Sequence, residues 1–141
     1  MIVETHSDKE TFDFGKQLGT KAAPGSIFCL NGDLGTGKTV IAKGIAAGLG
    51  ITEPVSSPTF TVVKEYTEGR LPLYHFDVYR IEDPEEMAEI GYEDFFYGSG
   101  VTVIEWSDLI ESIIPDEAVM IRIKKDASKG FDYRMIEISE K

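Results

Sequence analysis

The chain has 141 residues, the size of one domain, and we expect residues 1–141 to form a single domain. Its 42% hydrophobic and 28% charged residues are typical of a globular protein and exclude an intrinsically disordered one. The net charge of −11, from 25 acidic and 14 basic residues, disfavours a protein that binds DNA or RNA by itself. Nucleic-acid binding draws most of its affinity from lysine and arginine at phosphates.

The sequence lacks the signals of a secreted or membrane protein. No apolar run approaches the roughly 20 residues that span a bilayer. The first residues, Met-Ile-Val-Glu-Thr-His, have neither the basic patch nor the apolar stretch of a signal peptide. Cys29 is the only cysteine, so an internal disulfide bond is precluded, as suits a reducing compartment. We therefore expect a cytoplasmic protein that does not contact membranes.

The first third of the chain predicts a helix, a buried strand and a second helix, in that order. Ser7 and Glu10 form a capping-box pattern that starts the first helix, and Pro24-Gly25 ends it. Residues 27–30 are continuously apolar, as in a parallel strand that is covered on both faces. After a glycine-rich stretch, apolar residues recur at every fourth position from 41 to 49, which predicts an amphipathic helix.

The rest of the chain predicts antiparallel additions to a parallel core. Strand-like segments, short helices and a second buried strand follow in this order: strands 59–66 and 73–79 joined as a hairpin, a helix that starts at 83–86, a helix over 92–96, a strand over 101–104, and a hairpin of 118–123 with 133–138. We therefore expect an α/β protein with the P-loop NTPase fold: a small parallel sheet, extended by antiparallel hairpins and flanked by helices.

The glycine-rich stretch between strand and helix matches the P-loop pattern G-x-x-x-x-G-K-[ST]. The glycines allow the backbone to approach phosphates closely, and the loop amides then converge on them. Lys38 is expected to reach the β- and γ-phosphate oxygens, and the Thr39 hydroxyl is expected to bind Mg²⁺. The residues expected to bind the nucleotide here are Asp33, Leu34, Gly35, Thr36, Gly37, Lys38 and Thr39.

A P-loop enzyme also needs an acid near its metal, at the end of a neighbouring strand. Asp77 follows one predicted strand and Glu105 follows another. We expect both to face the nucleotide as catalytic residues and metal ligands. One would hold the metal or its water and the other would polarise the attacking water, and the sequence leaves the division of roles open.

Two further positions are candidates for the nucleotide pocket. Thr59 lies in the loop before the first hairpin, where P-loop switch proteins often place a threonine that senses the γ-phosphate. Trp106 follows Glu105 and is expected either to line the pocket or to fill the core. Arg80 is expected either to contact phosphate or a partner, or to form a surface salt bridge. His75 has no partner at metal-ligand spacing, which indicates a structural role.

With these segments assembled, the chain resembles the TsaE family, the P-loop ATPases of bacterial tRNA threonylcarbamoyladenosine biosynthesis. The resemblance extends from about residue 5 to residue 123 and rests on five blocks in the order of the family: Gly32-Asp33-Leu34-Gly35-Thr36-Gly37-Lys38-Thr39, Ser57-Pro58-Thr59-Phe60, His75-Phe76-Asp77-Val78-Tyr79-Arg80, the acidic stretch around Glu86, Glu89 and Gly91, and Ile104-Glu105-Trp106.

The resemblance implies a protein that binds ATP and Mg²⁺ and hydrolyses ATP slowly by itself. It implies TsaD and TsaB as partners, the pair that transfers a threonylcarbamoyl group to adenosine in tRNA, with hydrolysis resetting that pair for repeated turnover. The nucleotide is then expected near the interface with TsaD, and tRNA is contacted only through partners. By residue match, Lys38 and Thr39 hold phosphate and metal, Asp77 and Glu105 are the acids, and Thr59 is a switch residue.

Three other functions compete with a partner-controlled ATPase. A small-molecule kinase usually clamps its substrates with several arginines, often on a lid, and the four arginines of this chain are not clustered. A GTPase would carry the Asn-Lys-x-Asp motif, which is absent. A nucleotide-binding adaptor without significant catalysis stays open, because slow, partner-dependent hydrolysis resembles it in isolation.

Overall fold

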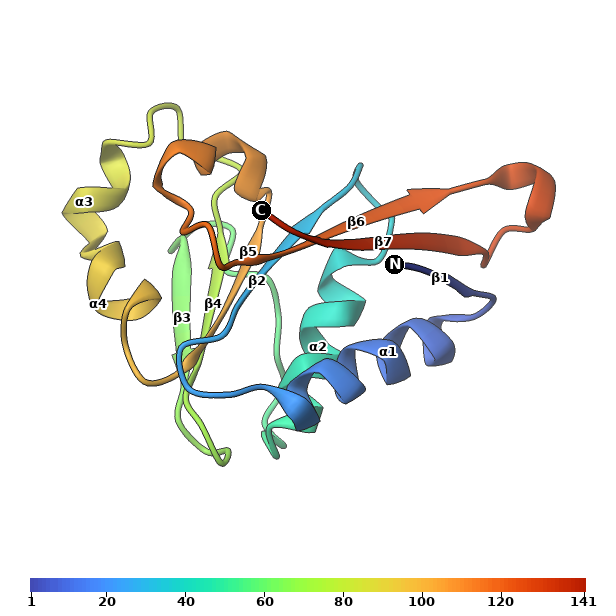
Figure 1. The fold of residues 1–141 in the computed structure, drawn as a ribbon, viewed down its shortest axis with the longest axis horizontal. Helices are drawn as coiled ribbons and strands as arrows, with labels where there is room; N and C mark the ends of the chain where they lie inside the picture. Colours follow the sequence, from blue (N-terminus) through green and yellow to red (C-terminus); the bar gives the residue numbers. More distant parts are fainter.

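The computed structural model describes all residues 1–141 as a seven-stranded mixed sheet with helices on both faces (Figure 1). Along the sheet the strand order is β1-β7-β6-β2-β5-β4-β3. The central strands β6, β2, β5 and β4 are parallel, whereas β3, β7 and β1 are added antiparallel to their neighbours. The strands are β1 (Ile2–Thr5), β2 (Ile27–Asn31), β3 (Val63–Tyr66), β4 (Leu73–Asp77), β5 (Val101–Glu105), β6 (Val119–Lys125) and β7 (Arg134–Glu140). The expected α/β architecture, a parallel core with antiparallel hairpins, is confirmed.

The four α-helices begin where the sequence predicts. They are α1 (Asp8–Lys21), α2 (Lys38–Gly48), α3 (Glu86–Ile90) and α4 (Tyr92–Phe96), with 3₁₀ helices η1 (Ser107–Ile113) and η2 (Ala127–Lys129). At the start of α1, Ser7 Oγ accepts a hydrogen bond from the Glu10 amide and Glu10 Oε1 accepts one from the His6 amide, each 3.1 Å long. No helix is long and apolar enough to span a membrane.

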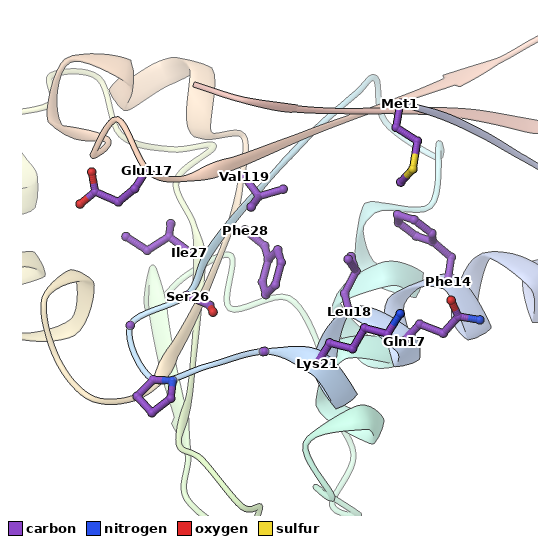
Figure 2. A pocket seen from close by; sticks show the side chains of 13 residues that line it. Met1, Phe14, Gln17, Leu18, Lys21, Ser26, Ile27, Phe28, Glu117 and Val119 are labelled. Carbon is purple, nitrogen blue, oxygen red and sulfur yellow. The ribbon is translucent and has the colours of Figure 1, made fainter.

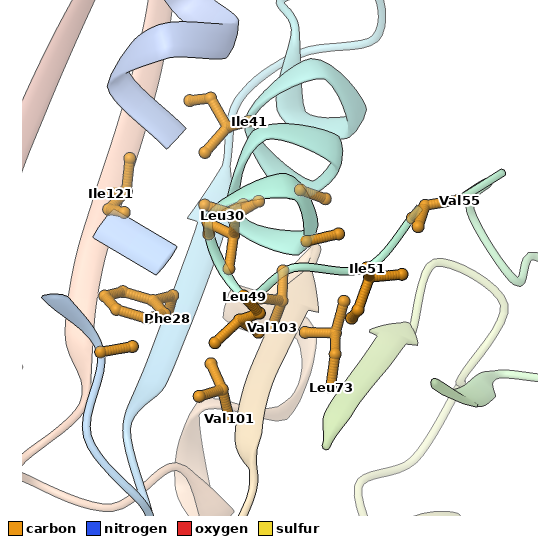
Figure 3. Close-up of a cluster of buried hydrophobic side chains, with 14 of the residues drawn as sticks. Phe28, Leu30, Ile41, Leu49, Ile51, Val55, Leu73, Val101, Val103 and Ile121 are labelled. Atoms are coloured by element: carbon orange, nitrogen blue, oxygen red, sulfur yellow. The ribbon is translucent and has the colours of Figure 1, made fainter. Parts of the chain in front are cut away.

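Strand β2 is apolar throughout because each of its faces packs in a different core. Phe28 and Leu30 belong to the core on the side of α1 and α2, and Figure 3 shows these side chains gathered between α2 and the sheet. Ile27 and Cys29 belong to the core on the other side, together with Phe96 of α4. Strand β2 therefore lies in the middle of three layers. The loop after its carboxyl end therefore starts from a strand that is anchored in both cores.

Four details differ from the sequence prediction. Strand 59–66 begins only at Val63, because residues 58–62 form a turn in which the Val62 amide bonds to the Pro58 carbonyl at 2.8 Å. Strand 73–79 ends at Asp77, where the Val78 amide turns to the Glu105 carbonyl. Strand β1 and the 3₁₀ helices η1 and η2 were not predicted. Strand β1 is a short edge strand that pairs only with β7, so its sequence carries little signal.

Helices α1 and α2 cross at glycines and approach each other unusually closely. A Cβ atom on Gly15 would lie 2.4 Å from the Ile41 carbonyl oxygen, and one on Gly44 would lie 2.3 Å from the Phe12 carbonyl oxygen. These distances are shorter than any ordinary contact, so only glycine fits at the crossing. The crossing therefore fixes the position of α2 relative to α1.

The crossing predicts that Gly44→Ala destabilises the protein, although alanine normally favours a helix. We expect the free energy of unfolding to fall by about 1–3 kcal/mol, because the new methyl group forces the two helices apart. Urea denaturation measures this loss. Lys43→Ala, at the exposed neighbouring position of the same helix, serves as the control and is expected to change stability by less than about 0.5 kcal/mol. A Gly44→Ala variant as stable as the wild type would contradict the close crossing.

Candidate functional site

The candidate site lies at the carboxyl ends of the parallel strands, around the loop that joins β2 to α2. A cavity of about 450 Å³ opens there. Its lining combines the loop and α2 with the ends of β4 and β5, the Ser57–Thr59 segment and the β6–β7 connection: Leu34, Gly35, Gly37, Lys38, Thr39, Val40, Ser57, Thr59, Asp77, Glu105, Trp106, Phe131, Asp132 and Arg134, with Asp8 at the start of α1. Ligands of open α/β sheets bind at this edge.

The loop has the backbone that a phosphate cradle requires. Gly35 and Gly37 have φ angles of +77° and +108°, which side chains with a Cβ rarely adopt. The Thr36 hydroxyl donates to the Asp33 carbonyl at 2.8 Å and closes the turn from inside. Gly37 is the N-cap of α2, so the free amides and the positive end of the helix dipole face the cavity.

Lys38 is buried and lies across the floor of this cradle. Its Nζ donates to the carbonyl oxygens of Gly32 at 2.6 Å and Asp33 at 2.9 Å, and it lies 4.1 Å from the centre of the Trp106 ring. Burial lowers the pKa of Lys38, while the nearby carboxylates of Glu105, Asp77 and Asp33 act in the opposite direction. An anion bound in the cradle would favour the charged ammonium in the same way.

Glu105 connects the loop helix to the sheet. It is the last residue of β5, the strand next to β2, and its side chain is buried. Its Oε1 accepts a hydrogen bond from the Thr39 hydroxyl at 3.1 Å, and its Oε2 lies 2.6 Å from His75 Nε2. Nδ1 of His75 is buried without a partner, so the bond to Glu105 is the only polar contact of that ring.

Asp77 lies beside Glu105 because β4 and β5 run parallel, with these two residues in register. Its carboxylate accepts hydrogen bonds from the Ser57 hydroxyl and from the Tyr79 amide, the latter at 3.0 Å. The Asp77 amide donates to the Val62 carbonyl at 2.8 Å. Asp77 is therefore fixed to the loop that carries Thr59, whereas Glu105 is fixed to Thr39.

The chain turns sharply after Glu105. Trp106 has a φ angle of +65°, in the left-handed region that residues other than glycine seldom occupy. Its ring lies against Tyr79, with ring centres 4.8 Å apart, and beneath the Lys38 ammonium. Asn31 holds this turn to the end of β2: its Nδ2 donates to Ser107 Oγ at 2.8 Å and its Oδ1 accepts from the Asp108 amide at 3.1 Å.

The structure brings most of the predicted site residues to one cavity, including Thr59 and Trp106. Asp33 and Thr36 do not line it; they shape the loop from behind through the bond between them. Arg80 also stays outside, with its guanidinium 4.7 Å from the centre of the exposed Phe60 ring.

Sequence reasoning did not single out Ser57, His75 or Arg134 as parts of the site or its support. The sequence predicts a structural role for His75, which is buried outside the cavity, but gives no sign that its Nε2 lies 2.6 Å from Glu105 Oε2. Ser57 stood in a motif block without an assigned task. Arg134, in the predicted C-terminal hairpin, lines the cavity although 96 positions separate it from Lys38 in the chain. Ser57 and His75 could have been found from the sequence, because both lie in segments on which the family resemblance rests.

A second cavity, of about 540 Å³, lies where α1 ends and where β2 and β6 begin (Figure 2). Its walls are mainly apolar, with Phe14, Leu18 and Phe28 among them. The longer polar side chains around it are exposed and do not converge on one point: Gln17, Lys21 and Glu117. A ligand site usually combines apolar walls with converging polar groups, so the loop cavity is the candidate site.

A strand, a glycine loop and a helix with lysine and threonine at its start, beside two acids at the ends of parallel strands, define a P-loop nucleotide-binding protein. The chain belongs to the TsaE family: the family model described as "Threonylcarbamoyl adenosine biosynthesis protein TsaE" matches residues 5–135. The expected family is confirmed. The protein is thus one of tRNA threonylcarbamoyladenosine biosynthesis, from a family of P-loop ATPases, and nucleotide binding follows from the family.

Individual relatives agree with this assignment. The chain is 50% identical over 121 residues to the tRNA threonylcarbamoyladenosine biosynthesis protein TsaE of Bacillus subtilis, a match that covers 86% of this chain and 75% of the relative. It is 42% identical to the protein of the same name from Treponema pallidum, with 85% and 88% covered. A solved structure described as "Crystal structure of Bacillus subtilus YdiB" matches with a TM-score of 0.85 and 41% identity, covering 99% of this chain and 84% of that one.

The bond between His75 and Glu105 predicts that His75→Phe is strongly destabilising even without nucleotide. The substitution keeps an aromatic ring but leaves a buried carboxylate oxygen without its partner, and we expect a loss of about 3 kcal/mol in the free energy of unfolding at neutral pH. Urea denaturation of the ligand-free protein measures it. Adding Glu105→Gln should restore part of the loss, because no buried charge then remains. A double variant as unstable as the sum of the two single variants would show that the pair is not coupled.

Proposed function

We propose that this chain is a single ATPase domain that binds ATP with Mg²⁺ in the loop cavity and hydrolyses it. Hydrolysis would reset the TsaB–TsaD threonylcarbamoyltransferase for repeated turnover in tRNA modification. One observation carries the proposal: Asp77 and Glu105 lie in register at the ends of β4 and β5 and share a cavity with Lys38 and Thr39. The family membership supports the same reading.

The phosphate groups of ATP would lie in the loop between Gly35 and Thr39. The loop amides and the start of α2 supply a positive field there. Lys38, now bonded to two carbonyl oxygens of the loop, would turn its ammonium to the β- and γ-phosphate oxygens. Its burial makes each such contact stronger than it would be in water.

The donors of the cavity fit Mg²⁺, which prefers hard oxygen ligands and binds proteins through one or two carboxylates plus phosphates. Thr39 offers a hydroxyl, and Glu105 and Asp77 offer carboxylates. The Thr39 hydroxyl can donate its proton to Glu105, as it does in the structure, and still present its lone pairs to a cation. Bound Mg²⁺ would neutralise charge that develops on the phosphate oxygens.

The two acids have different tasks in this proposal. Glu105, fixed between Thr39 and His75, is placed on the metal side, where it orients the Thr39 hydroxyl. Asp77, fixed to Ser57, would accept a hydrogen bond from the water that attacks the γ-phosphorus. That attack forms a bond from phosphorus to the water oxygen, and the bond to the β-phosphate oxygen breaks, which yields ADP and phosphate.

Thr59 would act as a switch through the turn that contains it. The turn ends at Val62, whose carbonyl accepts the Asp77 amide, and Thr59 lines the cavity. A shift of this turn towards or away from the γ-phosphate would therefore move the loop that holds Asp77. Such a turn is suited to transmit the state of the nucleotide.

Exposed apolar side chains at the rim of the cavity support an activity that depends on a partner protein. Leu34 and Phe131 both line it and are 72% and 88% exposed, which is unusual for large apolar side chains. Exposed apolar groups at a site mark a surface that another protein covers. With a net charge of −11, the chain would reach tRNA only through its partners.

The proposal predicts Mg²⁺-dependent ATP hydrolysis that the TsaB–TsaD pair stimulates. Phosphate release from ATP and GTP is measured with and without the pair. Lys38→Ala should abolish the activity, and Asp77→Asn should lower the stimulated rate by about 10²-fold or more while ATP still binds. Asp13→Asn, at a half-exposed acid on α1 that pairs only with Lys9, is the matched control with an unchanged rate.

Two outcomes would decide against the ATPase. Tight ATP binding without hydrolysis, even when the pair is present, would favour a nucleotide-binding adaptor. Transfer of the γ-phosphate to an added small-molecule acceptor would favour a kinase. An Asp77→Asn variant that hydrolyses ATP at the wild-type rate would contradict the role of Asp77 alone.

A further inference from the structure

Arg134 is a buried cation on the side of the nucleotide cavity away from the two acids. It is the first residue of β7, it lines the cavity, and only 8% of it is exposed. The five ion pairs of the structure do not include it. Asp8 and Asp132 also line the cavity, but neither is within 4.0 Å of its guanidinium.

The guanidinium instead joins two loops through their carbonyl groups. Nε donates to the Thr36 carbonyl at 2.7 Å, and Nη2 lies 3.5 Å from the Gly35 carbonyl. Nη1 donates to the carbonyls of Phe131 and Tyr133, at 2.9 and 2.7 Å. The planar, forked group of arginine can hold acceptors in several fixed directions at once, which an ammonium cannot do. Arg134 therefore ties the phosphate loop to the β6–β7 connection.

No carboxylate lies within 4.0 Å of the Arg134 guanidinium. Arg70 also binds carbonyls, those of Gly19, Thr20 and Ala22, but it is exposed to solvent and lies at the negative end of the α1 dipole. Arg134 lies beside the start of α2, where the dipole is positive. A buried charge without an opposite charge is costly. Nη2 has only one long contact and keeps donor capacity. An anion in the cavity would relieve this cost.

We propose that Arg134 is a positioning residue for nucleotide binding, with a role that no sequence motif indicated. It fixes the carbonyls of Gly35 and Thr36, so that the amides of the phosphate loop stay directed into the cavity. A bound di- or triphosphate would place opposite charge close to its guanidinium. The inference rests on nucleotide binding at the loop, as proposed above, and gives the C-terminal hairpin a function in that binding.

Calorimetric titration with ADP and ATP tests the inference, well below the unfolding temperature of each variant. For Arg134→Met we expect a rise in Kd of about tenfold or more, because the variant loses the positive charge and the hydrogen bonds that tie the phosphate loop to the β6–β7 connection. For Arg134→Lys we expect a smaller rise in Kd, because the positive charge stays and only the planar, forked guanidinium group is lost. Arg122→Met is the matched control: it removes an arginine from the same hairpin, where it pairs with the exposed Asp108, and should leave Kd unchanged.

The salt dependence separates this role from a purely structural one. Between low and moderate NaCl, Kd of the wild type and of Arg134→Lys should rise with similar slopes, and Kd of Arg134→Met should rise less steeply, because one charge near the phosphates is missing. A Kd within twofold of the wild type for Arg134→Met, or for Arg134→Lys if Met does not fold, would overturn the inference. So would equal salt slopes. Failure of the wild type to bind either nucleotide would instead contradict the proposed function itself.

Discussion

The hydrogen bond between Thr39 and Glu105 joins the phosphate loop to the sheet, and the arrangement of the site depends on it. It links the first turn of α2 to the end of β5 across the carboxyl edge of the parallel strands. The bond forms only because β2 and β5 are neighbours and both are buried on two faces. The glycine crossing fixes how closely α1 and α2 approach each other, and so helps to hold the helix that carries Thr39.

Backbone strain is concentrated at the same place. Only two residues other than glycine have positive φ angles, Val62 and Trp106. Trp106 directly follows Glu105, and the Val62 carbonyl accepts the Asp77 amide. Such conformations cost of order 1–3 kcal/mol each and persist where the surroundings impose them. The fold thus places its least favourable backbone beside each of the two acids, where two neighbouring strands end.

Local patterns predicted the parts of the site that lie close together in the chain. The P-loop needed only eight residues and their flanking strand and helix, and the acids followed from the ends of apolar strands. Contacts between distant segments carried no such pattern. His75 looked isolated because its partner, Glu105, is 30 residues away in the chain. Arg134 looked isolated because the Thr36 carbonyl to which it donates is 98 residues away in the chain. Residues 59–62 are predicted as strand because β-branched residues dominate them, and the hydrogen bonds of the turn override that preference.

Trp106 is the only tryptophan of the chain, and its ring lies 4.1 Å from the Lys38 ammonium. Indole emission depends on the charges and the water around the ring. A ligand that draws the ammonium to its phosphates changes the electric field at this ring. The change can be followed without attaching a label to the protein. The residue that makes the sharp turn after Glu105 is therefore also an optical probe at the centre of the site, and its emission spectrum reports where Lys38 lies.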